Sequence, residues 1–267
     1  MTNAKTHEEL VRFWNESADY YTVNSEMNEL GTESHERIAA ALVRAEAKSV
    51  VDIGCGTGHV ASVIAALDSE IAYTGVDVAT AAVEGARASG RPGTYLVADT
   101  ATLPFENASF DAAISLYALE HFTRPEASLQ EMARVVRPGG LVAIFSMNYD
   151  RPLGTVSSIR FGLRDKPRRH PANVAAYIAR RSGHIAKQSL KHVRYAVDKG
   201  YTSFQLVERP LVLDEPYQVD FDAVHVVSGE SVLRVLEQNG CTIVSSNVPR
   251  RLFAKRPVGL EVFAQKR

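Results

Sequence analysis

A regular alternation of apolar strand-like segments with helix-like segments, between residues 49 and 146, constrains the fold most strongly. Because strands that alternate with helices at this spacing form parallel β-α-β units, we expect a sheet covered by helices on both faces. The chain is therefore predicted to be an α/β protein with a doubly wound, Rossmann-like sheet. The predicted strands are Ser49–Ile53, Ile71–Val76, Thr94–Ala98, Phe110–Leu116 and Leu141–Ser146, and the predicted helices between them are 58–67, Ala79–Ala88 and 125–136.

The segments that flank this alternation have other patterns. Helical spacing of apolar residues and capping residues predict helices over 5–22 and 32–46. The alternation breaks at about residue 148, and a basic stretch with a long helical segment follows. The flanking segments predicted after that point are a helix over about 172–198, a helix over Ser228–Gln238, and strands Thr242–Ser246 and Gly259–Ala264, paired antiparallel at one edge.

Composition excludes several classes of protein. The chain is 45% hydrophobic with a net charge of −1, which is ordinary for a globular protein, and it has no run of 18 apolar residues that could span a membrane. Residues 1–10 lack the apolar core of a signal peptide. Two cysteines give neither a disulfide framework nor a zinc site. We therefore expect a cytoplasmic protein that binds no metal and no membrane.

A glycine-rich loop, Gly54-Cys-Gly-Thr-Gly58, ends the first predicted strand and opens the next helix. Such a loop lets a ligand approach the backbone closely. In a nicotinamide-binding loop the third glycine would come one place later, where this chain has His59. Asp52 would repel a pyrophosphate but attract a cationic amino group. The loop therefore predicts a zwitterionic cofactor and argues against a nicotinamide dehydrogenase.

Two further acids end the next two predicted strands. Asp77 could accept hydrogen bonds from both hydroxyls of a ribose, and Asp99 could accept one from an adenine amino group. Either acid alone could instead be a helix cap or a solvated loop residue. Three acids at the carboxyl ends of successive strands, the edge where open α/β sheets bind ligands, favour one nucleoside-binding site.

Four segments carry a resemblance to a known family: VVDIGCGTGHVA, TGVDVA, VADTATLPFENASFDAAIS and EMARVVRPGGLVAI. They resemble the successive motifs of the class I S-adenosylmethionine-dependent methyltransferases, in the subfamily broadly typical of small-molecule methylation. The resemblance is close over about 48–147, loose over the final strands and absent over 148–222. It implies S-adenosylmethionine as cofactor, S-adenosylhomocysteine as product, and a seven-stranded sheet in the order 3-2-1-4-5-7-6 with an antiparallel last hairpin strand.

The resemblance also implies roles for individual residues. Tyr20 and Tyr21 end the first helix, where family members often fold a lid. We predict that Tyr21 contacts the cofactor, by a cation–π interaction with the sulfonium, and that Tyr20 contacts the acceptor, although one of the two could pack in the core. The remaining cofactor residues implied are Asp52, Gly54, Gly56 and Gly58 at the methionine part, Asp77 at the ribose, Val78, Asp99 and Thr100 at the adenine, and Leu116 beside them.

On this basis the chain divides into four parts. Residues 1–46 are predicted to form an N-terminal helical lid, and 47–147 the cofactor-binding core. Residues 148–222 are predicted to be an inserted cap that binds the acceptor. Residues 223–267 supply the helix and strands that complete the sheet.

The segment after the fourth strand is predicted to face the acceptor. Tyr117, Glu120 and His121 would line the cleft, with Glu120 binding the acceptor and Tyr117 taking part in catalysis. His121 is the leading candidate for a general base, because the pKa of a histidine, about 6.5, suits removal of a hydroxyl proton. His225 is the second candidate. The alternatives are that Glu120 and His121 only cap the next helix or line the cofactor pocket, and that His225 is a buried, hydrogen-bonded histidine.

The basic stretch, residues 151–199, contains 12 Lys or Arg and only two acids. Arg164 and Arg168 could clamp an anionic group on the acceptor. The stretch could instead contact nucleic acid, which the sparse aromatic residues and the overall charge disfavour. A third interpretation is a solvated face that pairs with acids of the same or another subunit, as in a homo-oligomer.

Taken together, these features predict an S-adenosylmethionine-dependent methyltransferase that acts on an O or N atom of a small-molecule metabolite, of the kind found in secondary metabolism. An anionic acceptor follows if the arginines clamp it. One alternative is an RNA or protein methyltransferase that docks through residues 151–199. Another is a non-catalytic module that binds S-adenosylmethionine.

Overall fold

The computed structural model describes residues 4–16, 33–147, 205–206, 225–226, 229–248 and 259–267. The described helices are α1 (Ala4–Glu16), α3 (Glu33–Arg44), α4 (His59–Leu67), α5 (Thr80–Ala88), the short 3₁₀ helix η1 (Leu119–His121), α6 (Pro125–Val135) and α9 (Gly229–Gln238). The described strands are β1 (Ser49–Ile53), β2 (Ala72–Asp77), β3 (Thr94–Val97), β4 (Phe110–Leu116), β5 (Val136–Met147), β6 (Gln205–Leu206), β7 (His225–Val226), β8 (Cys241–Ser246) and β9 (Gly259–Lys266).

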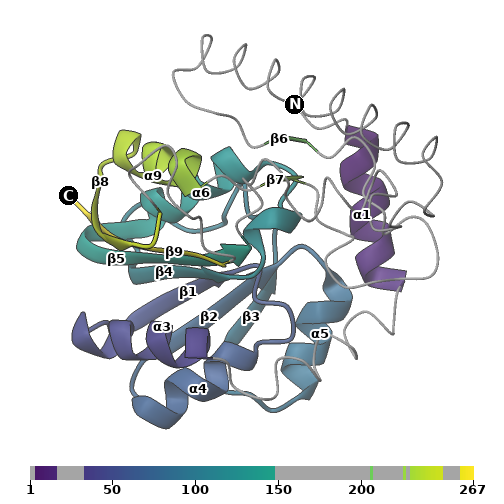
Figure 1. Ribbon diagram of the computed structural model, residues 1–267. Coiled ribbons are helices and arrows are strands. Elements are labelled where there is room, and N and C mark those ends of the chain that lie inside the picture. The colour runs from purple at the N-terminus through teal and green to yellow at the C-terminus, as the bar shows by residue number, and fades with distance from the viewer. Residues whose placement is uncertain (1–3, 17–32, 148–204, 207–224, 227–228, 249–258) are drawn as a thin grey trace, which may run out of the picture.

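Seven of these strands form one sheet in the order β3-β2-β1-β4-β5-β9-β8 (Figure 1). Strands β1 to β5 run parallel, and β9 lies between β5 and β8 and is antiparallel to both. This arrangement confirms the predicted order 3-2-1-4-5-7-6 with its antiparallel last hairpin strand. The two-residue strands β6 and β7 form a separate antiparallel pair.

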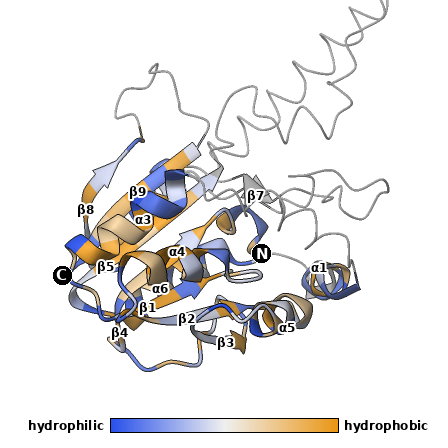
Figure 2. Ribbon diagram, turned by 90° about the horizontal axis from the view of Figure 1, so that it is seen from below, coloured by the Kyte–Doolittle hydropathy of each residue, from blue (hydrophilic) through white to orange (hydrophobic). Residues whose placement is uncertain are grey.

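Helices cover both faces of the sheet because successive strand residues point to opposite sides. Val50 packs in a cluster with residues of α3, α4 and α5, and its neighbour Val51 packs in a second cluster with residues of α6 and α9. Figure 2 shows the hydrophobic colour running along the strands of the sheet between these helices. Burial on both faces therefore explains the continuous apolar runs in the strand segments.

Helix α1 packs beside α5, near the carboxyl end of β2 (Figure 1). Leu10 and Trp14 of α1 form a small buried cluster with Ala79, which lies just after β2. The His7 Nδ1 and Thr123 Oγ1 atoms, 2.8 Å apart, join the same helix to the segment after η1. The N-terminal helix is thus held against the edge of the sheet where ligands bind in such folds.

The boundaries of the described core elements agree with the sequence to within a residue or two, except in β5. We expected this strand at Leu141–Ser146, but it already begins at Val136, where it pairs with Phe110. The register then shifts before Leu141, and Gly139 takes a φ of +83°. The Arg-Pro-Gly-Gly segment, residues 137–140, therefore follows the end of α6 and forms an irregular start of the strand.

Several predicted elements lie outside the described residues. These are residues 17–22 of the first predicted helix and the long helix over about 172–198. Within the described parts of the chain, no helix is long and apolar enough to cross a membrane. The same parts contain no group of three or more side chains able to hold a metal ion.

Candidate functional site

The glycine loop between β1 and α4 is tied to the end of β2. The backbone amides of Gly54 and Cys55 donate to the carbonyl oxygen of Val76, at 2.8 and 3.0 Å. Gly54 and Gly58 both have a φ of +78°, and an added Cβ would lie 2.5 Å from Ala118 and 2.6 Å from the ring of Tyr95, respectively. Packing therefore requires glycine at both positions.

Gly56, the middle glycine, differs from its neighbours. It has a φ of +52°, but an added Cβ would meet nothing within 4 Å. The loop is therefore closed by protein at Gly54 and Gly58 and open at Gly56. An open backbone position at the end of the first strand of a parallel sheet is where a ligand can approach.

The carboxylate of Asp77 holds this loop in place. Its Oδ2 atom accepts a hydrogen bond from the Gly56 amide at 2.9 Å, and its Oδ1 atom accepts one from the Ala79 amide at 2.9 Å. Burial raises the pKa of Asp77, and these amides act in the opposite direction. Since each carboxylate oxygen has two lone pairs, the contacts leave acceptor capacity for the predicted ribose hydroxyls.

Asp52 is buried beneath the loop, with an exposed fraction of 3%. Its Oδ2 atom accepts a hydrogen bond from the Tyr73 hydroxyl at 2.6 Å. Its buried Oδ1 atom accepts none from any residue that the structure describes. Burial raises the pKa of Asp52 to about 7, the Tyr73 hydroxyl lowers it, and the charge of Asp77 raises it. A buried acceptor without a donor fits a site for a cationic group.

The loop after β3 contains the residues predicted for the adenine. Asp99 accepts a hydrogen bond from the Ala101 amide at 2.9 Å and forms an ion pair with Arg124, which the sequence did not point to. The Thr100 hydroxyl lies 2.8 Å from that of Ser128. The loop is therefore attached to the start of α6.

The end of β4 holds the residues predicted to line the cofactor and the acceptor. Leu116 is partly buried against the cluster of α3 and α4. Tyr117 has a φ of +50°, an unusual conformation for a bulky residue, and its amide extends the pairing with β5 by donating to Phe145 at 2.8 Å. Its hydroxyl lies 2.6 Å from that of Ser34, at the start of α3. Strain of this kind often accompanies functional sites.

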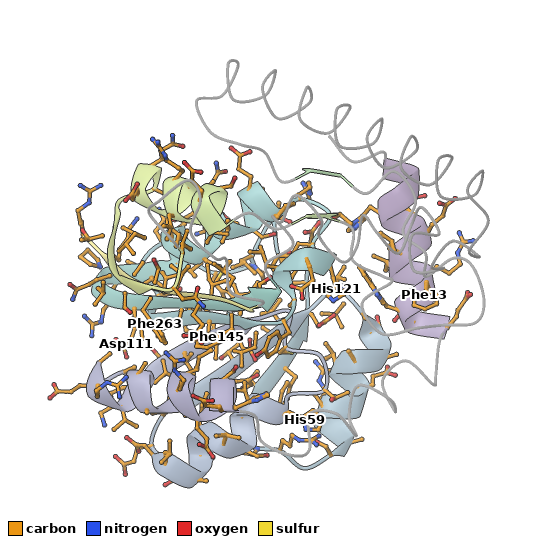
Figure 3. The ribbon with its side chains drawn as sticks, in the orientation of Figure 1. Phe13, His59, Asp111, His121, Phe145 and Phe263 are labelled. Carbon is orange, nitrogen blue, oxygen red and sulfur yellow. The ribbon has the colours of Figure 1, made fainter. Side chains whose placement is uncertain are left out.

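The two remaining candidates after β4 are arranged differently. Glu120 has an exposed fraction of 1%, and its carboxylate accepts a hydrogen bond from Ser146 at 2.8 Å, so it lies below the surface. His121 is close enough to Asp77 for its charge to lower the pKa of that acid. Figure 3 shows His121 toward α1, whereas Asp111 lies at the opposite end of β4. The backbone of β7, which contains His225, lies beside η1.

Other predicted site residues lie outside the described parts of the chain. These are Tyr20, Tyr21, Arg164 and Arg168. Val78 is described and packs against the cluster between α1 and α5, where it lies next to Asp77. The structure thus brings together Asp52, Asp77 and the glycine loop, with His121 within electrostatic reach.

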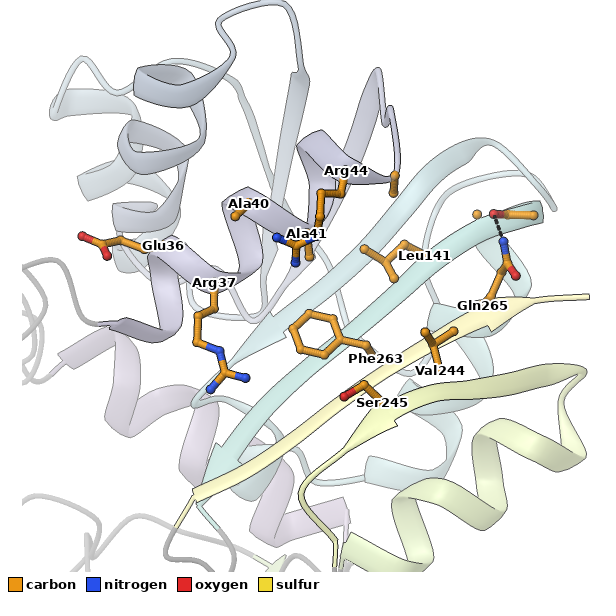
Figure 4. Close-up of a pocket in the computed structure, with 13 residues that line it drawn as sticks. Glu36, Arg37, Ala40, Ala41, Arg44, Leu141, Val244, Ser245, Phe263 and Gln265 are labelled. Atoms are coloured by element: carbon orange, nitrogen blue, oxygen red, sulfur yellow. Dashed lines mark hydrogen bonds between the residues drawn. The ribbon is translucent and has the colours of Figure 1, made fainter.

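A groove of about 690 Å³ lies elsewhere, between α3 and the strands β5, β9 and β8 (Figure 4). Phe263 and Leu141 form part of its floor, and Val244 of the edge strand is 66% exposed beside it. The lining contains none of the predicted site residues. The groove therefore does not belong to the candidate site.

Sequence reasoning missed three residues that contact the site: Tyr73, Ser34 and Arg124. Tyr73 has the pattern of an ordinary strand residue, and Ser34 that of a helix cap. Arg124 precedes a proline at the start of a helix. No local signal in the sequence distinguishes these residues from neighbours that do not contact the site.

Comparison with known proteins identifies the central domain. Residues 51–144 match the family described as a methyltransferase domain. An uncharacterized methyltransferase of Mycobacterium marinum is 35% identical over 152 residues, which are 56% of this chain and 57% of that protein. The O-methyltransferase resE of Aspergillus sclerotiorum is 32% identical over 148 residues, which are 52% of this chain and 53% of that protein. The chain thus spans about half the length of the curated relatives it matches.

A solved structure agrees with the fold. An S-adenosylmethionine-dependent methyltransferase of Thermotoga maritima superposes with a TM-score of 0.57 at 16% identity, covering 96% of this chain and 99% of that chain. The matched family range contains the glycine loop and the acids at 52, 77 and 99. Residues 51–144 thus match a methyltransferase domain, and the chain has the fold of an S-adenosylmethionine-dependent methyltransferase, a combination that indicates S-adenosylmethionine as the cofactor.

Proposed function

We propose that the whole protein is a methyltransferase that transfers the methyl group of S-adenosylmethionine to an O or N atom of a small-molecule metabolite. The observation that carries this proposal is the buried Oδ1 atom of Asp52, which lies next to an open glycine loop and has no donor among the residues that the structure describes. The ammonium group of the methionine part supplies the missing partner. Asp77, already fixed by two backbone amides, is available to the ribose.

The tasks of the protein in methyl transfer are those that the cofactor does not perform. The bound cofactor supplies an already activated methyl group. The residues of the chain therefore have to bind and orient the acceptor and to exclude water, and such orientation can lower a barrier by about 7–11 kcal/mol. A hydroxyl acceptor also needs a base, and an amine acceptor needs only to be held neutral.

His121 is the proposed base. Its electrostatic effect on Asp77, the residue that we propose for the ribose, supports this role. A neutral imidazole there can take the proton of an acceptor hydroxyl as the bond to the methyl group forms. His225 remains the second candidate, since the backbone of β7 lies beside η1. Tyr117 is proposed to help orient the acceptor at the end of β4.

The class of acceptor is supported by the names of curated relatives. The resE protein is named as an O-methyltransferase, and it is similar to this chain over about half of its length. We therefore favour a hydroxyl group on a small molecule. Our proposal that Arg164 and Arg168 bind an anionic group of this acceptor rests on the local excess of positive charge in the sequence.

A methyl-transfer assay with the full chain tests this function. Methyl-labelled S-adenosylmethionine is incubated with pools of small phenols, alcohols and amines, and in parallel with total RNA and total protein. We expect label in a small-molecule product and equimolar S-adenosylhomocysteine. Label that enters only RNA or protein would contradict the small-molecule assignment. Binding of S-adenosylhomocysteine without transfer to any acceptor would contradict catalysis.

A further inference from the structure

The loop after β3 is attached to the start of α6 by two side-chain contacts. The loop residues are Asp99 and Thr100, and their partners, Arg124 and Ser128, are one helical turn apart. Asp99 forms an ion pair with Arg124, and the Thr100 hydroxyl lies 2.8 Å from the Ser128 hydroxyl. The Ser128 hydroxyl and amide also donate to the carbonyl oxygen of Arg124, at 3.1 and 3.0 Å. The four residues thus form one connected unit, which we call the loop clasp.

The two connections of the loop clasp differ in burial. Thr100 and Ser128 are 8% and 0% exposed, so their hydroxyl pair is an interior anchor. The side chains of Asp99 and Arg124 are 26% and 49% exposed, so their ion pair lies at the rim. Surface ion pairs contribute little to folding stability. We therefore expect the rim pair to add little to the attachment of the loop, and its main effect is on the geometry of the Asp99 carboxylate.

The rim pair fixes the orientation of one carboxylate. Oδ1 of Asp99 accepts a hydrogen bond from the Ala101 amide at 2.9 Å, and Oδ2 accepts one from an Nη of Arg124. With both oxygens held, the carboxylate cannot turn about its terminal bond without losing a partner. A free lone pair on each oxygen still points away from these donors. The carboxylate is therefore a preorganised acceptor with a defined direction.

We infer that Arg124 is a positioning residue for the adenine of the cofactor, an inference that rests on the proposed function. Arg124 holds the Asp99 carboxylate turned so that it accepts a hydrogen bond from the 6-amino group. Its positive charge also offsets the cost of bringing a carboxylate close to the purine ring. Arg124 itself does not touch the reacting atoms, and its effect is on selectivity for the base.

The test compares two ligands that differ at this amino group. S-inosylhomocysteine has a carbonyl oxygen where S-adenosylhomocysteine has the 6-amino group, so a fixed carboxylate should repel it. Calorimetry with the full-length protein should give a preference for the adenine ligand of about tenfold or more. Arg124→Gln should reduce this preference by about tenfold, because the carboxylate can then turn away. Arg124→Lys, which keeps the charge, should retain most of it.

A matched control is available at the other edge of the sheet. Arg137 forms an ion pair with Asp111, with side-chain exposures of 47% and 17%, and neither residue belongs to the site. Arg137→Gln should therefore leave the preference unchanged. The inference is overturned if Arg124→Gln weakens both ligands by the same factor, if it changes neither, or if Arg137→Gln has the same effect.

The behaviour of the unsubstituted protein separates this inference from the proposed function. If it binds S-adenosylhomocysteine selectively but methylates no acceptor, the proposed function fails while the role of Arg124 is still decided by the variants. If it binds neither ligand, both proposals are wrong. If it binds both ligands equally, the role of Arg124 is wrong even where methyl transfer is found.

Discussion

Gly56→Ala is the substitution that isolates ligand contact from folding. Gly56 lies in the left-handed region, with a φ of +52°, and the added Cβ would have no neighbour within 4 Å. The matched control is Gly90→Ala, after α5, where φ is +70° and the added Cβ also meets nothing within 4 Å. Both variants therefore carry the same kind of backbone strain and no clash, but only Gly56 lies in the proposed cofactor loop.

The expected magnitudes follow from these two facts. A left-handed conformation costs an alanine about 1–2 kcal/mol, and the lower entropy of the unfolded chain returns about 0.4–1 kcal/mol. Each variant should thus lose about 1 kcal/mol of stability, which corresponds to a fall in Tm of about 2–4 °C. If the methionine part of the cofactor occupies the open side of Gly56, the added methyl overpacks that contact by about 1–3 kcal/mol. The dissociation constant should then rise about 5- to 150-fold.

Calorimetry with S-adenosylhomocysteine and thermal unfolding of the unliganded proteins supply both quantities. We expect similar Tm values for the two variants, with weakened binding in Gly56→Ala alone. Equal dissociation constants for Gly56→Ala and Gly90→Ala would refute the reasoning, because the open backbone at Gly56 would then not face the cofactor. Gly58→Ala cannot serve in this test, since its Cβ would lie 2.6 Å from the ring of Tyr95 and disturb packing.

Three further substitutions test the acids and the base. Asp77→Asn leaves one backbone amide without its acceptor and should cost about 1–3 kcal/mol in denaturant unfolding, with binding of S-adenosylhomocysteine weakened about tenfold or more. Asp111→Asn is the control, because Asp111 also accepts hydrogen bonds from backbone amides. It should lose comparable stability but keep its affinity for S-adenosylhomocysteine. Equal losses of affinity in Asp77→Asn and Asp111→Asn would contradict the ribose assignment. Burial raises the pKa of Asp52 from 3.8 to about 7, so its contribution to stability is present at low pH and is lost as the pH rises through 7. Asp52→Asn should lack this slope in denaturant titrations, and an unchanged slope would disprove the titration. His121→Ala should lower kcat about 100-fold or more with unchanged affinity for S-adenosylhomocysteine, and a near-normal kcat would exclude it as the base.

The fold could be predicted wherever a segment carried its own periodic signal. Phe110–Leu116 is apolar on both faces because it lies in the middle of a parallel sheet, and its predicted and observed bounds agree. The order of the strands came from the family resemblance, since periodicity does not specify neighbours. The start of β5 was missed because proline and glycine normally interrupt strands. Here the pairing of Val136 with Phe110 overrides that local preference.

The site could be predicted only in part, for a related reason. The position of Asp77 at the end of β2 could be predicted, because it follows from the place of the residue in a strand and because the carboxyl ends of parallel strands share one edge. The partners of the site residues are set by tertiary contacts instead. Tyr73 lies 21 residues from Asp52, Arg124 25 residues from Asp99, and Ser34 83 residues from Tyr117. A single sequence carries no signal for pairs at such separations.

Asp52, Asp77 and Asp99 differ in the hydrogen bonds that their carboxylates accept from the protein before a ligand binds. This difference suggests a different role for Asp52 than for the other two acids. Asp77 and Asp99 have both oxygens on protein donors, so ligand binding costs little reorganisation at either position. Asp52 has one oxygen on Tyr73 and one that has no donor within the described parts of the chain, which makes its ionised form costly. In our proposal, an ammonium group offsets the cost of ionising Asp52. The nucleoside part of the same ligand donates hydrogen bonds to Asp77 and Asp99. A ligand that joins both groups in one molecule therefore gains from all three carboxylates, whereas a nucleoside alone leaves Asp52 unsatisfied.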